Sequence, residues 1–372
     1  MRANNALALV FTNTSDHMLE GLTGVRSMAS VPFGGRYRII DFHLSNIVNA
    51  GISKIGLVPR ANYRSLMDHI GSGRPWDLDR KMGGMSFLPP FIDGNAGMYK
   101  GHIDAIHNLR SYISKGQHEY VVLCDANTIL NIDLKAMFKQ HKKNGADITI
   151  AYKNGPLPAF ESGHTLYGIE ADGRINEVLI SEEAGKICNY GISIGIFRRD
   201  LLLEMAKKAT EQGIHSINRA IQLGIHNTSK IYGYKVENFI ATIDGIKSYT
   251  DANMALLSRD VRRDLFNSER PIYTKTRDDM PTRYGLNSSV KNSIIGEGCI
   301  IEGEVLNCVL FRGVKVGKGA KLENCIIMQD SVIGDNCNLK YVTADKDVTL
   351  SEGVTLMGAE ANHYIIKKGT TI

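Results

Sequence analysis

The sequence lacks the features that mark membrane proteins and nucleic-acid-binding proteins. None of its apolar stretches approaches the ~18–20 residues that a membrane-spanning helix requires, so we expect no membrane partner. The N-terminal stretch has one arginine and a short apolar run but no long hydrophobic region or cleavage site, which indicates a buried first strand and not a signal peptide. Lysine and arginine are scattered along the chain, and without a basic cluster we expect no nucleic-acid partner.

Metal-binding cysteine patterns are also missing. The six cysteines show no CxxC spacing and no nearby pair of histidines, so the sequence predicts no metal site and no bound cofactor. We interpret the cysteines as reduced, buried thiols of a cytoplasmic protein. They are Cys124, Cys188, Cys299, Cys308, Cys325 and Cys337.

The first part of the chain, residues 1–260, alternates short apolar runs with amphipathic segments. This alternation predicts an α/β domain whose mostly parallel sheet is covered by helices on both faces. Such sheets bind ligands beyond the carboxyl ends of their strands, where residues 11–35 and 125–133 would lie. The expected strands are Ala6–Phe11, Lys54–Val58, Tyr120–Cys124, Asp147–Tyr152 and Ile192–Phe197, and the expected helices are Ile103–Ser114, Leu134–Lys143 and Asp200–Lys208.

The rest of the chain has a different pattern. Residues 261–287 are charged and contain two prolines, which predicts an extended linker. In residues 288–372, an Asn-x-apolar-apolar unit recurs about every three hexapeptides, with glycine and asparagine at the corners. This period indicates a solenoid of short parallel strands. A small β-sandwich is the alternative, but it does not explain the recurring unit. The units are Asn292–Ile295, Asn307–Leu310 and Asn324–Ile327.

Four blocks, in the expected order, resemble the ADP-glucose pyrophosphorylase (glucose-1-phosphate adenylyltransferase) family. Residues 31–42 read VPFGGRYRIIDF and residues 73–80 read GRPWDLDR. Residues 99–105 contain Tyr-Lys-Gly followed by Asp-Ala, and residues 252–254 read ANM. The resemblance spans the chain and implies a GT-A, Rossmann-like nucleotidyltransferase domain with a mixed sheet, followed by a left-handed parallel β-helix. The family reaction joins ATP and glucose 1-phosphate into ADP-glucose and pyrophosphate.

Most residues that the family uses for this chemistry are absent. The phosphate-binding loop aligns with residues 12–19, which contain no glycine and place the negative Asp16 where a triphosphate would lie. The two Mg²⁺-binding carboxylates align with Asn127 and Thr242, and an amide is a poorer ligand than a carboxylate. The lysine before the VPFGG block aligns with Met28. The family's sugar-phosphate lysine, which aligns with residues 180–182, is missing as well.

The resemblance implies a vestigial nucleotide or sugar pocket. Its retained members would be Trp76, Asp77, Tyr99, Gly101 and Asp125, although all of them could instead be structural. Asp125 and Asp244 neighbour the lost metal positions and could rebuild a Mg²⁺ site. His102 and His107 lie near the nucleotide edge and are better explained as helix-face residues.

Three arginines match, or loosely match, positions of the family's sugar-phosphate effector site. Arg26, Arg38 and Arg312 could bind phosphate bidentately through their planar guanidinium groups. The alternative is that they are solvated or paired with carboxylates. We treat them as exposed cations, so that an alanine substitution should leave folding intact.

Three functions are compatible with these observations. The one we favour is a non-catalytic regulatory subunit, of the GlgD type, that modulates a catalytic homologue in glycogen synthesis. The second is an active adenylyltransferase with a rebuilt Mg²⁺ site, and the third is a sensor that binds sugar nucleotides without turnover. Because a solenoid leaves open strand edges that need covering, we also expect homo-oligomers, or hetero-tetramers with a catalytic subunit.

Overall fold

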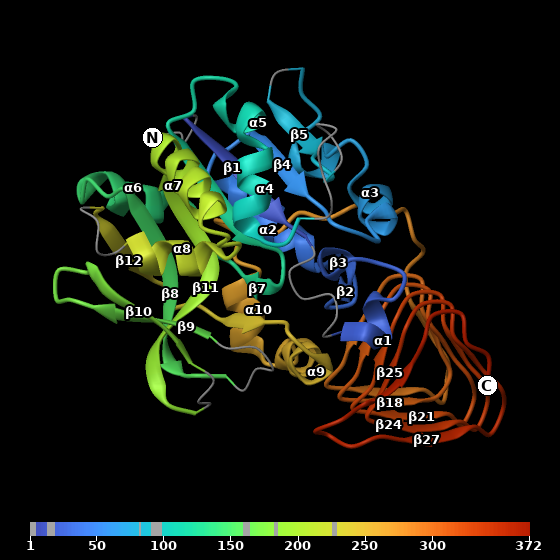
Figure 1. The fold of residues 1–372 in the computed structure, drawn as a ribbon. Helices are drawn as coiled ribbons and strands as arrows, with labels where there is room; N and C mark the ends of the chain where they lie inside the picture. The colour runs from blue at the N-terminus through green and yellow to red at the C-terminus, as the bar shows by residue number, and fades with distance from the viewer. Residues whose placement is uncertain are drawn as a thin grey trace.

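Two domains follow each other along the chain, an α/β domain and then a parallel β-helix (Figure 1). The β-helix, orange to red in the figure, lies against one end of the α/β domain, beside helices α1 (Glu20–Thr23) and α9 (Ile246–Ala255). This order confirms the predicted succession of the two architectures. The computed structural model describes residues 5–12, 19–81, 83–90, 99–158, 164–181, 185–224 and 229–372.

Within the described residues, a nine-stranded mixed sheet forms the centre of the α/β domain, in the order β10-β9-β11-β6-β1-β4-β5; β8 also pairs with β11, and β12 pairs with β8. Strands β1, β4, β5 and β6 are parallel, and β11 runs antiparallel to β6. Every residue of β1 is buried; its even-numbered residues face one apolar cluster and its odd-numbered residues face the other. Both faces of the sheet are therefore covered. The strands are β1 (Ala6–Phe11), β4 (Lys54–Val58), β5 (Gly84–Phe87), β6 (Tyr120–Asp125), β8 (Ile148–Pro156), β9 (His164–Ile169), β10 (Ile175–Ser181), β11 (Ile187–Arg198) and β12 (Ile231–Lys235).

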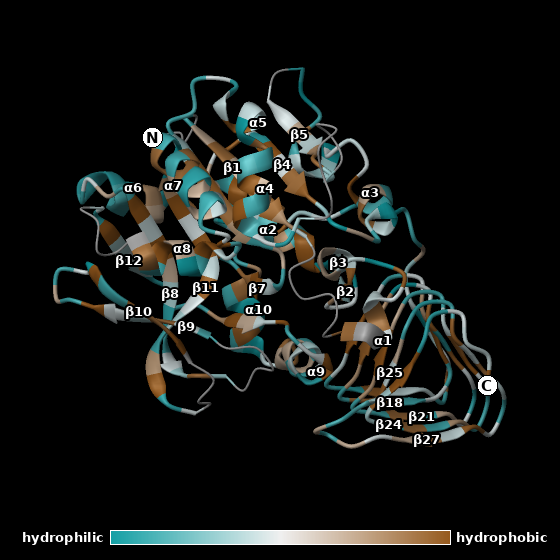
Figure 2. Cartoon of the chain, in the orientation of Figure 1, coloured by the Kyte–Doolittle hydropathy of each residue, from teal (hydrophilic) through white to brown (hydrophobic). Residues whose placement is uncertain are grey.

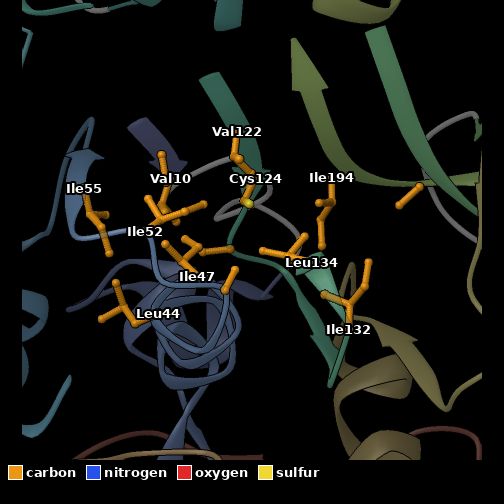
Figure 3. Packing of buried hydrophobic residues seen from close by; sticks show 14 of the residues in the cluster. Val10, Leu44, Ile47, Ile52, Ile55, Val122, Cys124, Ile132, Leu134 and Ile194 are labelled. Atoms are coloured by element: carbon orange, nitrogen blue, oxygen red, sulfur yellow. The ribbon is translucent and has the colours of Figure 1, made fainter. Parts of the chain in front are cut away.

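Helices supply the cover on each face. Leu44 and Ile47 of α2 and Leu134 of α6 pack against Val10 and Val122 on one face of the sheet (Figure 3). Helices α4, α5 and α7 cover the other face, and Figure 2 shows apolar strands such as β4 beside these helices. The remaining elements are α2 (Ile39–Asn49), α3 (Arg64–Ile70), α4 (His102–Asn108), α5 (Arg110–Ser114), α6 (Leu134–Lys143), α7 (Arg199–Glu211), α8 (Ile217–Gly224), α10 (Arg259–Leu265), the 3-10 helices Met28–Ser30 and Arg74–Trp76, and the small strands β2 (Pro32–Phe33), β3 (Tyr37–Arg38), β7 (Thr128–Leu130) and β13 (Ile240–Thr242).

Residues 283–372, all of which the structure describes, form three five-stranded parallel sheets that wind as a β-helix. The recurring units stack as predicted, with Ile294 beside Val309 and Val309 beside Ile326. Because the strands within each of these three sheets pair in parallel, the β-sandwich alternative is excluded. The strands are β14 (Arg283–Tyr284), β15 (Ser289–Lys291), β16 (Ile294–Ile295), β17 (Ile300–Ile301), β18 (Glu304–Leu306), β19 (Val309–Leu310), β20 (Lys315–Val316), β21 (Lys321–Glu323), β22 (Ile326–Ile327), β23 (Val332–Ile333), β24 (Asn338–Lys340), β25 (Val342–Ala344), β26 (Thr349–Leu350), β27 (Thr355–Met357) and β28 (Tyr364–Ile366).

The asparagines of the repeat form one corner of this coil. Asn292, Asn307 and Asn324 all have left-handed backbones, with φ of 44°, 52° and 53°. Asparagine tolerates this conformation better than most residues because its short side chain bonds locally. The Asn292 side-chain amide also donates to Asn307 Oδ1 at 2.7 Å, which joins two successive coils. The repeat spacing therefore follows from the corner geometry.

The connection between the domains corrects the predicted boundaries at 260, 261–287 and 288. Helix α10 runs across residue 260, and β14 at residues 283–284 already belongs to the β-helix. The extended segment between them is a strap that side chains fasten to α2. Asn49 donates to the Pro271 carbonyl, and Thr274 donates to buried Asp41 at 2.6 Å. Charge and proline content revealed the extended backbone, but not the contacts that hold it.

An apolar cluster joins the two domains. Leu22 of α1, Phe33, and Tyr249 of α9 pack with Val309 and Phe311 of the β-helix, and all five are at most 1% exposed. Burial on this scale fixes the two domains against each other, because apolar surface removed from water contributes ~25 cal/mol per Å². Side chains brought together across this junction can therefore form a preorganised site.

Candidate functional site

The carboxyl edge of the sheet carries an ion pair that the sequence did not reveal. Asp125 ends β6 and lies beside Phe11, the last residue of β1. His102 begins α4, and its Nε2 lies 2.6 Å from Asp125 Oδ1. The imidazole also packs edge-on to the Phe11 ring, with centroids 4.5 Å apart. His102 was interpreted as a helix-face residue; the structure places it over the strand ends.

Burial and the neighbouring carboxylate act in opposite directions on the pKa of His102. The side chains of His102 and Asp125 are 19% and 9% exposed. Burial lowers the pKa of His102, but the negative charge and hydrogen bond of Asp125 outweigh it, so that the pKa is raised above its usual value. Asp125 therefore favours the protonated form of the His102 imidazole.

Two cavities adjoin this ion pair. The outer one has a volume of about 290 Å³ and is lined by Tyr99 and Gly101, two of the residues that the resemblance assigns to the pocket. The inner one measures about 40 Å³ and includes Asp125 and Ser193. Ser193 has a left-handed backbone (φ 54°) at a register shift in β11, a strained geometry that no sequence pattern indicated.

The residues at the aligned metal positions do not fit Mg²⁺. Asn127 Oδ1 accepts a hydrogen bond from Thr128 at 3.1 Å, and Thr242 carries no charge. Asp125 is engaged by His102, and Asp244 is 6% exposed at the start of α9. Within the described ranges, no group of three His, Cys, Asp or Glu side chains could hold a metal ion. At the two aligned positions themselves, an amide and a hydroxyl therefore stand in place of the charged carboxylates that Mg²⁺ prefers.

Three of the positions that align with the family's phosphate and sugar residues lie away from the carboxyl-edge cavities or outside the described residues. Residues 13–18, including Asp16, and Glu182 lie outside the described residues. Met28, at the aligned lysine position, is fully buried in the interdomain cluster. Its environment is apolar, so a lysine could not be accommodated there without a partner for its charge.

Trp76 and Asp77 do not belong to the carboxyl-edge pocket, and this corrects the predicted grouping. Both line a different cavity of about 600 Å³, beside the turn at residues 48–53 that precedes β4. That turn lies at the opposite, amino-terminal edge of the parallel strands. Trp76 is 2% exposed in the core, and Asp77 pairs with Arg80. The GRPWDLDR motif thus builds a turn rather than the pocket.

The predicted effector arginines separate into two places. Arg26 and Arg38 lie at the junction of the domains, near Lys346, and we call these three residues the cation cluster. Arg26 is not an exposed cation: its guanidinium makes a bidentate pair with Asp345 (2.7 and 2.9 Å), and both side chains are 2% exposed. Arg312 belongs to a separate network, with its Nε 3.0 Å from Glu297 Oε2. The three arginines therefore do not form the single effector site that the resemblance implied.

Lys346, which the sequence reasoning missed, lacks a counter-charge of its own. No carboxylate of the described residues lies within ion-pair distance of its Nζ. Burial, and then the charges of Arg38 and Arg26, lower its pKa to about 7. Arg38 donates to the Ser65 carbonyl at 2.7 Å, and burial lowers its pKa to about 10. Cations destabilised in this way are suited to bind an anion, because the anion relieves their mutual repulsion.

Comparisons with known proteins agree with this architecture. Residues 16–256 match the nucleotidyl transferase family, and residues 279–367 match the GlmU-like C-terminal hexapeptide family. The fold and these matches define a nucleotidyltransferase-type domain followed by a left-handed β-helix, as the resemblance implied.

Full-length relatives narrow the assignment. The glycogen biosynthesis protein GlgD of Geobacillus stearothermophilus is 38% identical over 99% of this chain and 97% of the relative. GlgD of Bacillus subtilis (strain 168) is 34% identical over 98% and 96%. The glucose-1-phosphate adenylyltransferase of Acetivibrio thermocellus is 31% identical over 96% and 84%. The chain belongs to the glucose-1-phosphate adenylyltransferase (ADP-glucose pyrophosphorylase) family. Among the residues that the structure describes, no helix is long and apolar enough to cross a membrane.

Proposed function

We propose that this protein is a non-catalytic regulatory subunit in glycogen biosynthesis, which modulates a catalytic glucose-1-phosphate adenylyltransferase. One observation carries the proposal: a His102–Asp125 ion pair and the neutral Asn127 and Thr242 occupy the carboxyl edge where the family reaction needs carboxylates free to hold Mg²⁺. Phosphoryl chemistry depends on neutralising developing phosphate charge, and Asn127 and Thr242 carry no charge with which to hold the Mg²⁺ that does so. For the same reason we propose that the chain requires no Mg²⁺, because Asn127 and Thr242 replace the two metal-binding carboxylates.

We further propose that the cation cluster binds a phosphate-bearing effector. Arg26 is neutralised by Asp345, but Arg38 keeps its positive charge in a half-buried space, and an anion beside Lys346 would favour the protonated form of this lysine, whose pKa is about 7. A phosphate group supplies two negative charges and several acceptor oxygens, which suits this arrangement. Sugar phosphates are the class that the family resemblance implies, and Arg312 has no part in the site because Glu297 engages it.

The chain should act through assembly with its catalytic homologue, as a homo-oligomer alone or a hetero-tetramer with it. A subunit without turnover can change a partner's activity if it binds one partner conformation better than another. The test mixes the purified chain with a catalytic glucose-1-phosphate adenylyltransferase and follows pyrophosphate release from ATP and glucose 1-phosphate. The chain alone should show no turnover, and the mixture should differ from the catalytic subunit alone in rate or in its response to glucose 6-phosphate and inorganic phosphate.

Matched variants connect the assay to the structure. Lys346→Met should reduce the effector response of the mixture, whereas Lys315→Met, an exposed lysine on β20 of another sheet, should not. Turnover near ~10 s⁻¹ by the chain alone would overturn the proposal in favour of an active enzyme with a rebuilt site. Tight binding of ADP-glucose without turnover or any effect on the partner would favour the sensor.

A further inference from the structure

The imidazole of His102 is the wall between the outer and inner cavities. It is the only residue that lines both among the described residues: the outer cavity continues past it to Tyr99 and Arg60, and the inner cavity continues to Ser193 and Asn218. The Phe11 contact on one side and the Asp125 contact on the other hold the ring in this position. Two small spaces thus take the place of one pocket.

The frame around the ring is more rigid than the ring itself. Gly101 precedes α4, and a Cβ there would come within 2.4 Å of the His215 carbonyl oxygen, so the backbones pack closely. Ile103 donates its backbone N–H to the same oxygen at 3.0 Å, and His215 Nδ1 lies 2.8 Å from Asp104. With the start of α4 fixed in this way, rotation of the His102 side chain is the small movement that can join the cavities.

The chemistry on the two sides of the wall is complementary. The outer cavity has aromatic and apolar surface together with the cations Arg60 and Lys100. The inner cavity offers the neutral polar side chains of Ser193 and Asn218, which can bond to hydroxyl groups. Between them, the Asp125 carboxylate repels a phosphate unless His102 remains beside it. A joined space would reach the ~300–1,000 Å³ typical of ligand pockets.

We infer that His102 and Asp125 form an internal gate that keeps this chain from binding a sugar nucleotide, and that breaking the pair joins the two cavities into a binding site. This inference deepens the proposed function and rests on it, because it names what closes the site of the non-catalytic subunit. The gate is specific to side chains at the start of α4 and the end of β6. It needs no change in the fold.

The experiment measures binding of ADP-glucose and of ATP to the full-length chain by isothermal titration calorimetry. His102→Ala opens the wall, and His102→Ala/Asp125→Asn also removes the carboxylate charge. The double variant should bind ADP-glucose at least tenfold more tightly than the wild-type chain, and His102→Ala should gain less affinity, because its unpaired Asp125 carboxylate repels the diphosphate. His102→Gln keeps the bulk and a hydrogen bond to Asp125 and should remain closed. His107→Ala makes the same substitution later on α4, away from both cavities, and is the matched control.

Several outcomes decide the question. If the opened variants bind no better than the wild-type chain, the gate does not exist. The same conclusion holds if His107→Ala gains as much affinity, or if the wild-type chain already binds ADP-glucose as tightly as the opened variants. Should His102→Ala fail to fold, His102→Thr fills part of the space and gives the same comparison. Loss of partner modulation by the wild-type chain would contradict the proposed function alone, whereas intact modulation without gained affinity would contradict the gate alone.

Discussion

Replacing Asp345 with asparagine should destabilise the protein far more than an average substitution. Two hydrogen bonds of 2.7 and 2.9 Å join Asp345 to Arg26, and both side chains are 2% exposed. The variant keeps the shape of the side chain but leaves a buried guanidinium charge without its counter-ion, which costs ~3–5 kcal/mol. An average substitution costs ~1 kcal/mol. Lys346 and Arg38 increase the penalty, because their charges act on the same space.

Urea unfolding measures this effect directly. Trp76 is the only tryptophan in the sequence and is 2% exposed, so its fluorescence reports unfolding of the α/β domain. Asp347→Asn is the matched control, because Asp347 is 52% exposed and pairs only with a surface lysine at 3.6 Å. The control should change the free energy of unfolding by less than ~1 kcal/mol. Arg26→Met/Asp345→Leu removes both charges and should recover most of the loss.

The same variant examines the cation cluster. With Asp345 neutralised, an added phosphate ion becomes the counter-charge of Arg26, Arg38 and Lys346. Phosphate at 100 times its dissociation constant should restore ~2.7 kcal/mol. Equal losses for Asp345→Asn and Asp347→Asn, or a loss below ~1 kcal/mol for Asp345→Asn, would refute the reasoning that the buried pair holds the domains in register.

Two further predictions concern the β-helix. The pKa of Lys346 is about 7 in the folded protein, which is below its value of ~10.5 in the unfolded chain. Between these two pH values the unfolded chain binds more protons than the folded protein does. The free energy of unfolding should therefore rise with pH over this interval, and it should rise less steeply in Lys346→Met. Parallel pH profiles for the two proteins would contradict this. At the repeat corner, Asn324→Ala should destabilise the protein by ~1–2 kcal/mol more than Asn324→Gly, because φ is 53° there and alanine tolerates this left-handed backbone poorly. The alanine variant should therefore have the lower thermal midpoint. Calorimetry that ranks the two variants in the opposite order would contradict the corner argument.

Elements that local pattern determines could be predicted from the sequence. Helix α6 has the predicted bounds, Leu134–Lys143, because an apolar stripe and an aspartate cap define it locally. The β-helix could be predicted because its corner residues recur at each turn. Strand β11 begins at Ile187, five residues before the predicted start, because these first residues are exposed or only partly buried, apart from Tyr190, and form no apolar run.

Contacts between distant segments could not be predicted. Arg26 and Asp345 are 319 residues apart, and nothing near either residue distinguishes a buried arginine from an exposed one. The GRPWDLDR motif gave no sign of which edge of the sheet it occupies, because that depends on the turn leading into β5. His102 and Asp125 likewise meet only because α4 begins at the edge of the sheet where β6 ends. Site geometry of this kind requires the tertiary structure.

The division between what this chain keeps and what it has lost has a physical logic. The interdomain cluster needs apolar side chains from both domains, including Phe33 of the VPFGG block and Phe311 of the β-helix, so changes there would separate the domains. The carboxyl edge tolerates change, because an ion pair can fill the space of a ligand. Since Arg26 and Lys346 come from different domains, the cation cluster exists only while the domains are docked. An anion bound there must stabilise that docked arrangement, and a coupling of ~1–3 kcal/mol would suffice to alter a partner subunit's affinity by one to two orders of magnitude.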